Sequence, residues 1–183
     1  MNTLNTLTDI LEDEAILYDY VDLKEVANGM CINEGNEYYI LLDKKIKEDD
    51  ALHKAVLAEE LGHYYTMIDD PTPRADDSYH KQCRVEKEEE KAARWATSHL
   101  ISNDELLDFL ADNKQSNLYD LIDHFDVTQD ILMKKLHHMA AKQDYYEVCD
   151  NYYLCLTNLP SIYITRFFDK NIESKAKALY GRK

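Results

Sequence analysis

The sequence has no long apolar run, no basic N-terminal segment and no closely spaced cysteine pair. A membrane-spanning helix needs about 18 or more consecutive apolar residues, and an export signal needs a positively charged start followed by an apolar stretch. We therefore expect a protein that is neither exported nor membrane-spanning, with the cytoplasm as its location. The four cysteines are scattered along the chain, at Cys31, Cys83, Cys149 and Cys155. Without a Cys-x-x-Cys pair they fit reduced core thiols better than a disulfide framework or a zinc ribbon.

The sequence is also short of positive charge. It has 21 Lys and Arg against 36 Asp and Glu, which gives a formal net charge of -15 at pH 7. A groove for a phosphate backbone would have to overcome this field, so the charge argues against direct binding of nucleic acid. A basic protein partner would instead be attracted, chiefly through a faster association rate. The alternative interpretation is that the acidic surface only keeps the protein in solution.

Apolar residues are plentiful enough for one core, since 45% of the 183 residues are hydrophobic. The order of the patterns predicts an α+β fold, with a small antiparallel sheet near the N-terminus followed by a helical body. We expect one domain over residues 1–146, and a C-terminal extension over residues 147–183 that packs on the same domain.

The spacing of apolar residues places the expected strands and helices along the chain. Alternation around a turn at Gly35 predicts a hairpin, and the strand ranges we expect are 16–21, 30–32 and 37–42. Helical spacing predicts helices at 2–14, 49–68, 83–101, around 106–110, 118–125 and 128–146. The polar, proline-bearing stretch 69–82 predicts a loop, and residues 162–168 fit either a strand or an irregular docked segment.

The expected helix 49–68 carries the residues that could support chemistry. Apolar positions frame Glu59, Glu60 and His63, so this helix should be largely buried. Buried carboxylates and an imidazole are costly unless they are paired or bind a cation. Glu59 and His63 lie four residues apart on one face and could chelate one metal ion, while Glu60 could reach a water on that metal as the general base. The pattern is a variant of His-Glu-x-x-His in which Glu59 replaces the first histidine.

The expected helix 83–101 offers a third ligand. Val85, Glu89, Ala92 and Ala96 fall on one stripe, so Glu89 is the acidic residue predicted to point inward. Small residues at Ala92 and Ala96 would allow a close approach of the two helices. The alternative for Glu89 is a partly buried carboxylate paired with an Arg or a Lys.

These two segments resemble the ImmA/IrrE metallopeptidases of bacteria, phages and integrative elements. The resemblance rests on the run from Val56 to Thr66 and on the run from Glu89 to Ala96, and extends over roughly residues 15–140. It implies a zincin-like site and a zinc-dependent endopeptidase that cleaves a helix-turn-helix repressor of a mobile element or stress response. By position, Glu59, His63 and Glu89 match the metal ligands and Glu60 matches the catalytic base.

The replacement at Glu59 leaves other interpretations open. A Glu/His/Glu ligand set brings one more negative charge than the usual set, which should lower the Lewis acidity of Zn²⁺ and could favour Mn²⁺. The chain could also be a non-catalytic interaction module that binds the repressor without cleaving it. A two-metal oxidase is a more remote alternative, because it would need a second Glu-x-x-His motif that the sequence lacks.

Two further features have a structural and a functional interpretation. Tyr64 and Tyr65 could donate a hydrogen bond to a tetrahedral intermediate, although core packing explains at least one of them. Leu121, Val127 and Leu132 have the spacing of a helix-turn-helix core. Because Gln129, Asp130, Lys134 and Lys135 give only two positive charges on the would-be recognition helix, we interpret this segment as helical packing or as a surface for the repressor.

Overall fold

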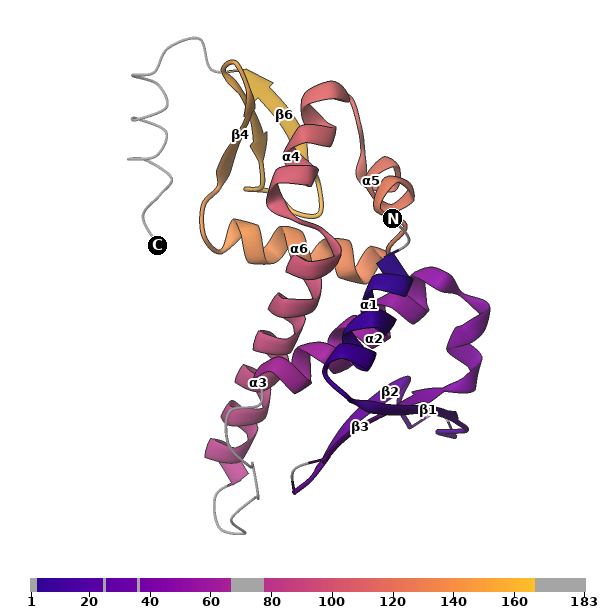
Figure 1. Ribbon diagram of the computed structural model, residues 1–183. Coiled ribbons are helices and arrows are strands. Elements are labelled where there is room, and N and C mark those ends of the chain that lie inside the picture. The colour runs from indigo at the N-terminus through magenta and orange to yellow at the C-terminus, as the bar shows by residue number, and fades with distance from the viewer. Residues whose placement is uncertain (1–2, 25, 36, 67–77, 167–183) are drawn as a thin grey trace. The chain divides into compact units, whose positions relative to one another are not determined.

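The computed structural model describes residues 3–24, 26–35, 37–66 and 78–166 (Figure 1). Over these residues the chain contains six α-helices and two small sheets, so the predicted α+β class is confirmed. The chain separates into two compact units, Met1–Leu100 and Ile101–Lys183, which we call unit 1 and unit 2. The predicted division between residues 146 and 147 falls inside a strand of unit 2.

The sheet of unit 1 has three strands in the order β1-β3-β2. The strands are β1 (Leu17–Val21), β2 (Gly29–Glu34) and β3 (Glu37–Asp43). β2 and β3 form the predicted antiparallel hairpin, and β1 runs parallel to β3. The hairpin turn contains Gly35 at a φ of 75°, a left-handed conformation that glycine adopts without a steric penalty. Because β1 and β2 lie at the edges, each pairs with β3 alone among the described strands.

The helices of unit 1 pack on one side of this sheet, as Figure 1 shows for α2. They are α1 (Thr3–Asp13), the short 3-10 helix η1 (Lys44–Glu48), α2 (Asp50–Thr66) and α3 (Ser78–Leu100). The Asp49 side chain accepts a hydrogen bond from the Leu52 amide at 3.0 Å and so caps the start of α2. Leu57 and Leu61 are fully buried, so α2 is the core helix that its pattern predicted.

α3 begins earlier than predicted. The sequence favoured a loop up to residue 82, whereas the helix already starts at Ser78. The segment 78–82 is polar but contains neither proline nor glycine, so nothing in it interrupts a helix and polarity alone was a poor guide to a loop. The rest of the predicted loop, with Pro71 and Pro73, lies outside the described residues.

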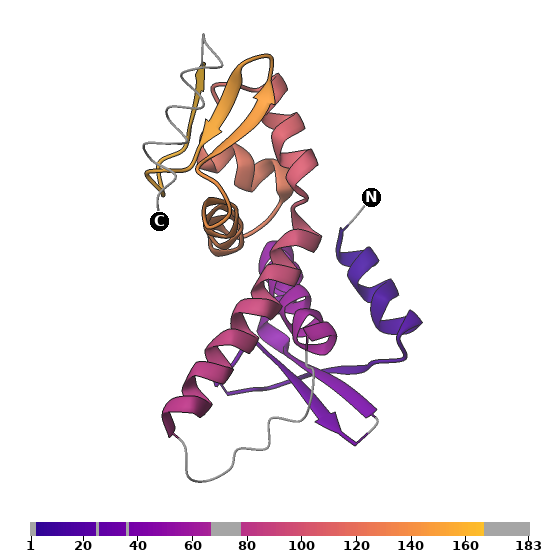
Figure 2. The ribbon, with the colours of Figure 1, turned by 90° about the vertical axis from the view of Figure 1, so that its left-hand side faces the viewer.

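Unit 2 combines three helices with a second sheet (Figure 2). Its elements are α4 (Asn103–Asp112), α5 (Leu118–Phe125), α6 (Gln129–Ala140), β4 (Tyr145–Cys149), β5 (Tyr152–Cys155) and β6 (Tyr163–Arg166). The three helices have side-chain caps at their N-termini, from Ser102, Asn117 and Thr128. The strands form an antiparallel sheet in the order β4-β5-β6.

This second sheet corrects the prediction of a single sheet near the N-terminus. The predicted helix 128–146 ends at Ala140, and Tyr145 and Tyr146 belong to β4 instead. Strands of four or five residues are too short to show a clear period, and here tertiary pairing decides their conformation. The segment 162–168, for which a strand was one alternative, contains β6.

The sequence also predicted reduced cysteines and no membrane-spanning helix. All four cysteines are free thiols, and Cys155 is fully buried in the core of unit 2. Among the described residues, no helix has the length and apolarity needed to cross a membrane.

Candidate functional site

The candidate site lies in unit 1, where α2 and α3 cross at their smallest residues. A Cβ atom added at Gly62 would lie 2.4 Å from the carbonyl oxygen of Ala92, which is far too close for a real contact. Ala92 and Ala96 are buried, as the prediction of a close helix approach requires. The crossing therefore brings the residues beside Gly62 on α2 within reach of those one turn before Ala92 on α3.

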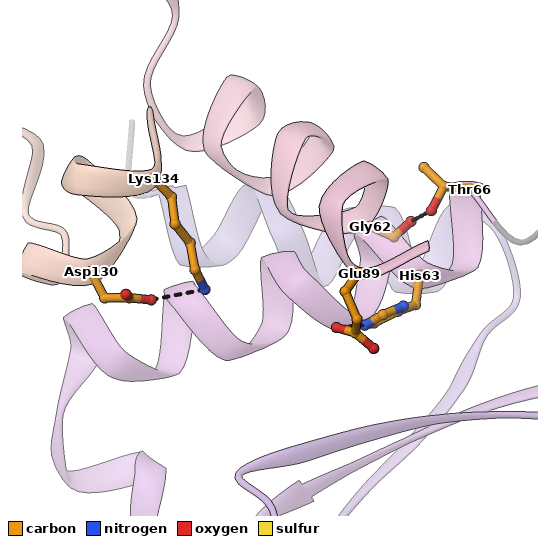
Figure 3. Close-up of polar contacts among 6 residues, drawn as sticks. All are labelled: Gly62, His63, Thr66, Glu89, Asp130 and Lys134. Atoms are coloured by element: carbon orange, nitrogen blue, oxygen red, sulfur yellow. Dashed lines mark hydrogen bonds and ion pairs between the residues drawn. The ribbon is translucent and has the colours of Figure 1, made fainter. Parts of the chain in front are cut away.

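His63 and Glu89 meet beside this crossing. The distance between His63 Nε2 and Glu89 Oε2 is 3.4 Å, and Figure 3 shows the two side chains converging from their two helices. The side chain of His63 is 20% exposed and that of Glu89 is 63% exposed. Glu89 thus reaches His63, but it is far more accessible than its predicted inward position implied. Val85, one turn earlier on the same stripe, is also exposed, so this end of α3 extends beyond the crossing.

Glu60 is buried between α2 and the edge strand β2. The backbone amide of Cys31 donates a hydrogen bond to its carboxylate. A Cβ atom at Gly29 would lie 2.6 Å from Glu60 Oε1, so only glycine leaves room for the carboxylate there. Neither contact was foreseen, because a backbone amide and the absence of a side chain leave little trace in a single sequence.

The electrostatics of Glu60 reflect its burial and its acidic neighbours. Burial is the largest cause that raises the pKa of Glu60 to about 7, and the nearby charges of Glu59 and Glu89 raise the pKa further. The hydrogen bond from Cys31 lowers the pKa, but by less. A carboxyl group with a pKa near neutrality can both accept and release a proton under physiological conditions.

The four predicted site residues therefore lie near one another, although their arrangement is looser than a complete ligand set. Within the described part of the chain, no group of three or more His, Cys, Asp or Glu side chains is placed so that it could hold a metal ion. His63 and Glu89 are the two proposed ligands whose atoms are in contact, and Glu59 lies close enough to Glu60 to raise its pKa.

Tyr64 and Tyr65 both contact Glu14, the residue that follows α1. Their hydroxyl groups donate hydrogen bonds to Glu14 at 3.1 and 3.0 Å. The ring of Tyr65 also stacks on Trp95 of α3, with 5.0 Å between the ring centroids. These contacts favour the packing interpretation for both tyrosines, because their donors already have an acceptor.

The edge of β2 next to Glu60 has backbone groups that do not bond to β3, its one partner among the described strands. The Asp43 amide donates to the Asn28 carbonyl at 2.8 Å, so the even-numbered residues of this segment bond to β3. The odd-numbered residues Gly29, Cys31 and Asn33 therefore direct their backbone groups away from β3, as the bond from Cys31 to Glu60 also indicates. An extended peptide could add to such an edge strand by backbone hydrogen bonds.

Comparison of the chain with protein-family models, with curated proteins and with solved structures finds no match. The arguments for a function therefore come from the site itself and from the motif resemblance.

Proposed function

We propose that this chain is a metal-dependent endopeptidase that acts at the crossing of α2 and α3. The observation that carries the proposal is the placement of Glu60, a buried carboxylate held between α2 and an edge strand, beside the contact of His63 with Glu89. In this assignment Glu60 is the general base, and Glu59, His63 and Glu89 are the ligands of a divalent cation, Zn²⁺ or Mn²⁺.

The donor set fits such a cation by its chemistry. An imidazole and two carboxylates are ligands that Zn²⁺ and Mn²⁺ both accept. The charges of Glu59 and Glu89 disfavour ionisation of Glu60, and a bound cation would relieve this repulsion. When bound, the cation would supply Lewis acidity, which makes a water molecule more acidic and a carbonyl group more electrophilic.

The residues of the chain then have distinct tasks. Glu60 accepts the proton of the attacking water, and the Cys31 amide holds the Glu60 carboxylate in place. The outward-directed backbone groups of β2, other than the Cys31 amide, would position an extended peptide by hydrogen bonds, which places a peptide carbonyl near Glu60 without requiring a particular side chain. The proposed substrate, by the motif resemblance, is a helix-turn-helix repressor, and its basic charge would be attracted by the net charge of -15.

A second candidate function is a non-catalytic module that binds the same repressor. Two observations favour it: Glu59 stands where a histidine is usual, and the described residues do not form a complete three-residue metal group. The two functions differ in one measurable property, because the module binds its partner without cleaving any peptide bond.

Metal content of the purified protein tests the ligand assignment. We expect about one divalent ion per chain, measured by elemental analysis, and a large loss of this ion in Glu89→Gln. Glu88→Gln and Glu90→Gln are the matched controls, because they remove the same charge from the same helix. Glu90 pairs with Arg94 at 2.9 Å. Equal losses in the three variants would overturn the assignment of Glu89.

Cleavage separates the enzyme from the module. Glu60→Gln should keep the metal and the repressor but slow cleavage about 100- to 10,000-fold, the usual worth of general-base assistance. Undiminished cleavage by Glu60→Gln with metal bound would exclude this mechanism. If the parent chain cleaves no repressor but Glu59→His does, the module is the correct function, and Glu59 is the residue that prevents catalysis.

A further inference from the structure

The sheet of unit 1 has a second face, on the side away from α2. Cross-strand register places Leu17, Tyr39 and Ile32 in one row and Asp19, Leu41 and Met30 in the next. The neighbours of these residues along each strand face α2. The Tyr20 hydroxyl of β1, for example, lies 2.8 Å from Nε2 of His53 on α2. Because side chains alternate along a strand, the two rows share the other face. We call these six residues the outer face.

The outer face is unusually apolar for a surface that faces solvent. Five of its six side chains are apolar or aromatic, and Leu17 and Met30 are 55% and 40% exposed. A solvated sheet face normally carries polar side chains, which alternate with the buried residues. Within the part of the chain that the structure describes, the helices that Figure 2 shows beside this sheet lie on the side of α2. Contiguous apolar patches of this kind usually mark an interaction site.

Negative charge borders the outer face at the hairpin end. Glu34 and Glu37 are direct cross-strand partners on the same face, in the row next to Tyr39. Like charges placed directly opposite one another in a sheet repel. The Tyr39 hydroxyl donates a hydrogen bond to Glu37, which keeps that carboxylate beside the apolar row. With Asp19 inside the face, the patch combines an apolar centre with unbalanced acidic groups.

We propose that the outer face is a docking surface for a basic amphipathic α-helix of a partner protein. The apolar rows would receive the apolar stripe of the helix, and lysine or arginine side chains beside that stripe would pair with Asp19, Glu34 and Glu37. The dimensions agree: β1, the shortest strand, has five residues and is about 17 Å long, and three strands are about 10 Å wide, which matches a helix of about 11 residues. A second copy fits less well, because it would bring the same net charge of -15.

A synthetic helical peptide of leucine and lysine provides the probe. We expect it to bind the full chain, measured by fluorescence anisotropy, and to shift the backbone amide resonances of Leu17, Ile32 and Leu41. The double variant Leu17→Ala/Met30→Ala should weaken binding about tenfold or more, since two apolar contacts are lost. Val26→Ala is the matched control, because Val26 is 79% exposed but belongs to no strand of the sheet.

A second pair of variants measures how much the acidic residues contribute to peptide binding. Glu34→Gln/Glu37→Gln should weaken binding of the leucine–lysine peptide about threefold or more at low salt and reduce the effect of added salt. Asp104→Asn/Asp108→Asn removes the same charge from exposed positions of α4 and should leave binding unchanged. Far-UV circular dichroism and the urea midpoint show whether each variant is folded.

Three results would overturn the proposal. The first is peptide binding that Leu17→Ala/Met30→Ala does not weaken. The second is equal binding of a leucine–glutamate peptide with the same apolar stripe. The third is a parent dimer, detected by light scattering, that Leu17→Ala/Met30→Ala converts to a monomer, since a second copy would then occupy the outer face. The docking surface does not depend on metal binding or cleavage, so its failure and that of the proposed endopeptidase are distinguishable.

Discussion

α2 of unit 1 and α6 of unit 2 each contribute to the core of their unit, but they bury different chemistry. α2 buries three ionisable side chains, His53, Lys54 and Glu60, beside its apolar residues. α6 buries four apolar residues and one lysine, Lys135. Burying a charged group costs several kcal/mol unless the group is neutralised or paired. Unit 1 therefore carries the larger cost of this kind.

The environments of these groups show how the two units differ. In unit 1 the sheet provides partners: Tyr20 lies at hydrogen-bonding distance from His53, and the Cys31 amide binds Glu60. In unit 2 burial is the main cause that lowers the pKa of Lys135 to about 8, with a smaller effect from Lys142. The sheet thus provides hydrogen-bond partners for the buried His53 and Glu60 of α2, as is typical of a functional site. The following variants test this contrast.

The largest effect is expected at the crossing of α2 and α3. Gly62→Ala would place a Cβ atom 2.4 Å from the backbone oxygen of Ala92, so α3 would have to move. We expect a loss of about 3 kcal/mol in the free energy of unfolding, measured by urea denaturation. Adding Ala92→Gly should not restore stability, because the clash involves a backbone atom. Parent-like stability of Gly62→Ala would show that the crossing is not a tight contact.

Glu60→Gln should stabilise the metal-free protein in a pH-dependent way. Because the folded pKa of about 7 lies above the ordinary value of 4.5, the folded state favours protonated Glu60. Its ionisation therefore destabilises the fold progressively from pH 4.5 to 7 and fully above pH 7. We expect Glu60→Gln to be more stable than the parent by roughly 2 kcal/mol at pH 8 and equal to it at pH 4. Urea midpoints in the presence of a chelator measure this, and a difference that does not vary with pH would contradict it.

The sequence was sufficient to predict the elements with a strong local signal. The hairpin around Gly35 and the buried helix α2 were predicted correctly, because turn chemistry and helical spacing both act over a few residues. The sheet of unit 2 was missed, because pairing between short strands such as β4 and β5 depends on tertiary contacts. The early start of α3 at Ser78 was missed because polarity was taken for a loop.

For the candidate site, the sequence could predict residue types but not their surroundings. The sequence predicted an inward-pointing Glu89 from helical spacing and from the small residues at the crossing; its carboxylate lies 3.4 Å from His63, while its role as a metal ligand stays a prediction. It could not predict how exposed Glu89 would be, because exposure depends on how far α3 extends beyond its partner helix. The hydrogen bond from the Cys31 amide to Glu60 could not be predicted from the sequence either, since every residue except proline has a backbone amide.

In unit 2, Lys135→Met tests the cost of the lysine that α6 buries. The folded pKa of about 8 lies below the ordinary value of 10.5, so the folded state disfavours the protonated lysine. The cost is full below pH 8 and disappears as the pH rises to 10.5. We expect Lys135→Met to be more stable than the parent by roughly 1 to 2 kcal/mol at pH 7, measured by urea denaturation, because the flexible lysine stem lets its charged end approach water. The advantage should vanish near pH 11; a constant advantage would indicate better packing instead of charge removal.

The smallest effect concerns a helix cap, where the two units should behave alike. Asn117 caps α5 by accepting from the amides of Tyr119 at 2.8 Å and Asp120 at 3.3 Å, while Asp120 accepts from the Asn117 amide at 2.7 Å. Asn117→Ala removes the side-chain acceptor and should cost about 1 kcal/mol of unfolding free energy in urea. Asp49→Ala, which removes the single cap of α2, should cost a similar amount, whereas Gln115→Ala, at an exposed position before α5, should cost nothing measurable. A difference of several kcal/mol between the two cap variants would contradict a purely local effect of the cap. A larger loss for Asp49→Ala would then indicate that the packing of the buried side chains of α2 depends on where that helix begins.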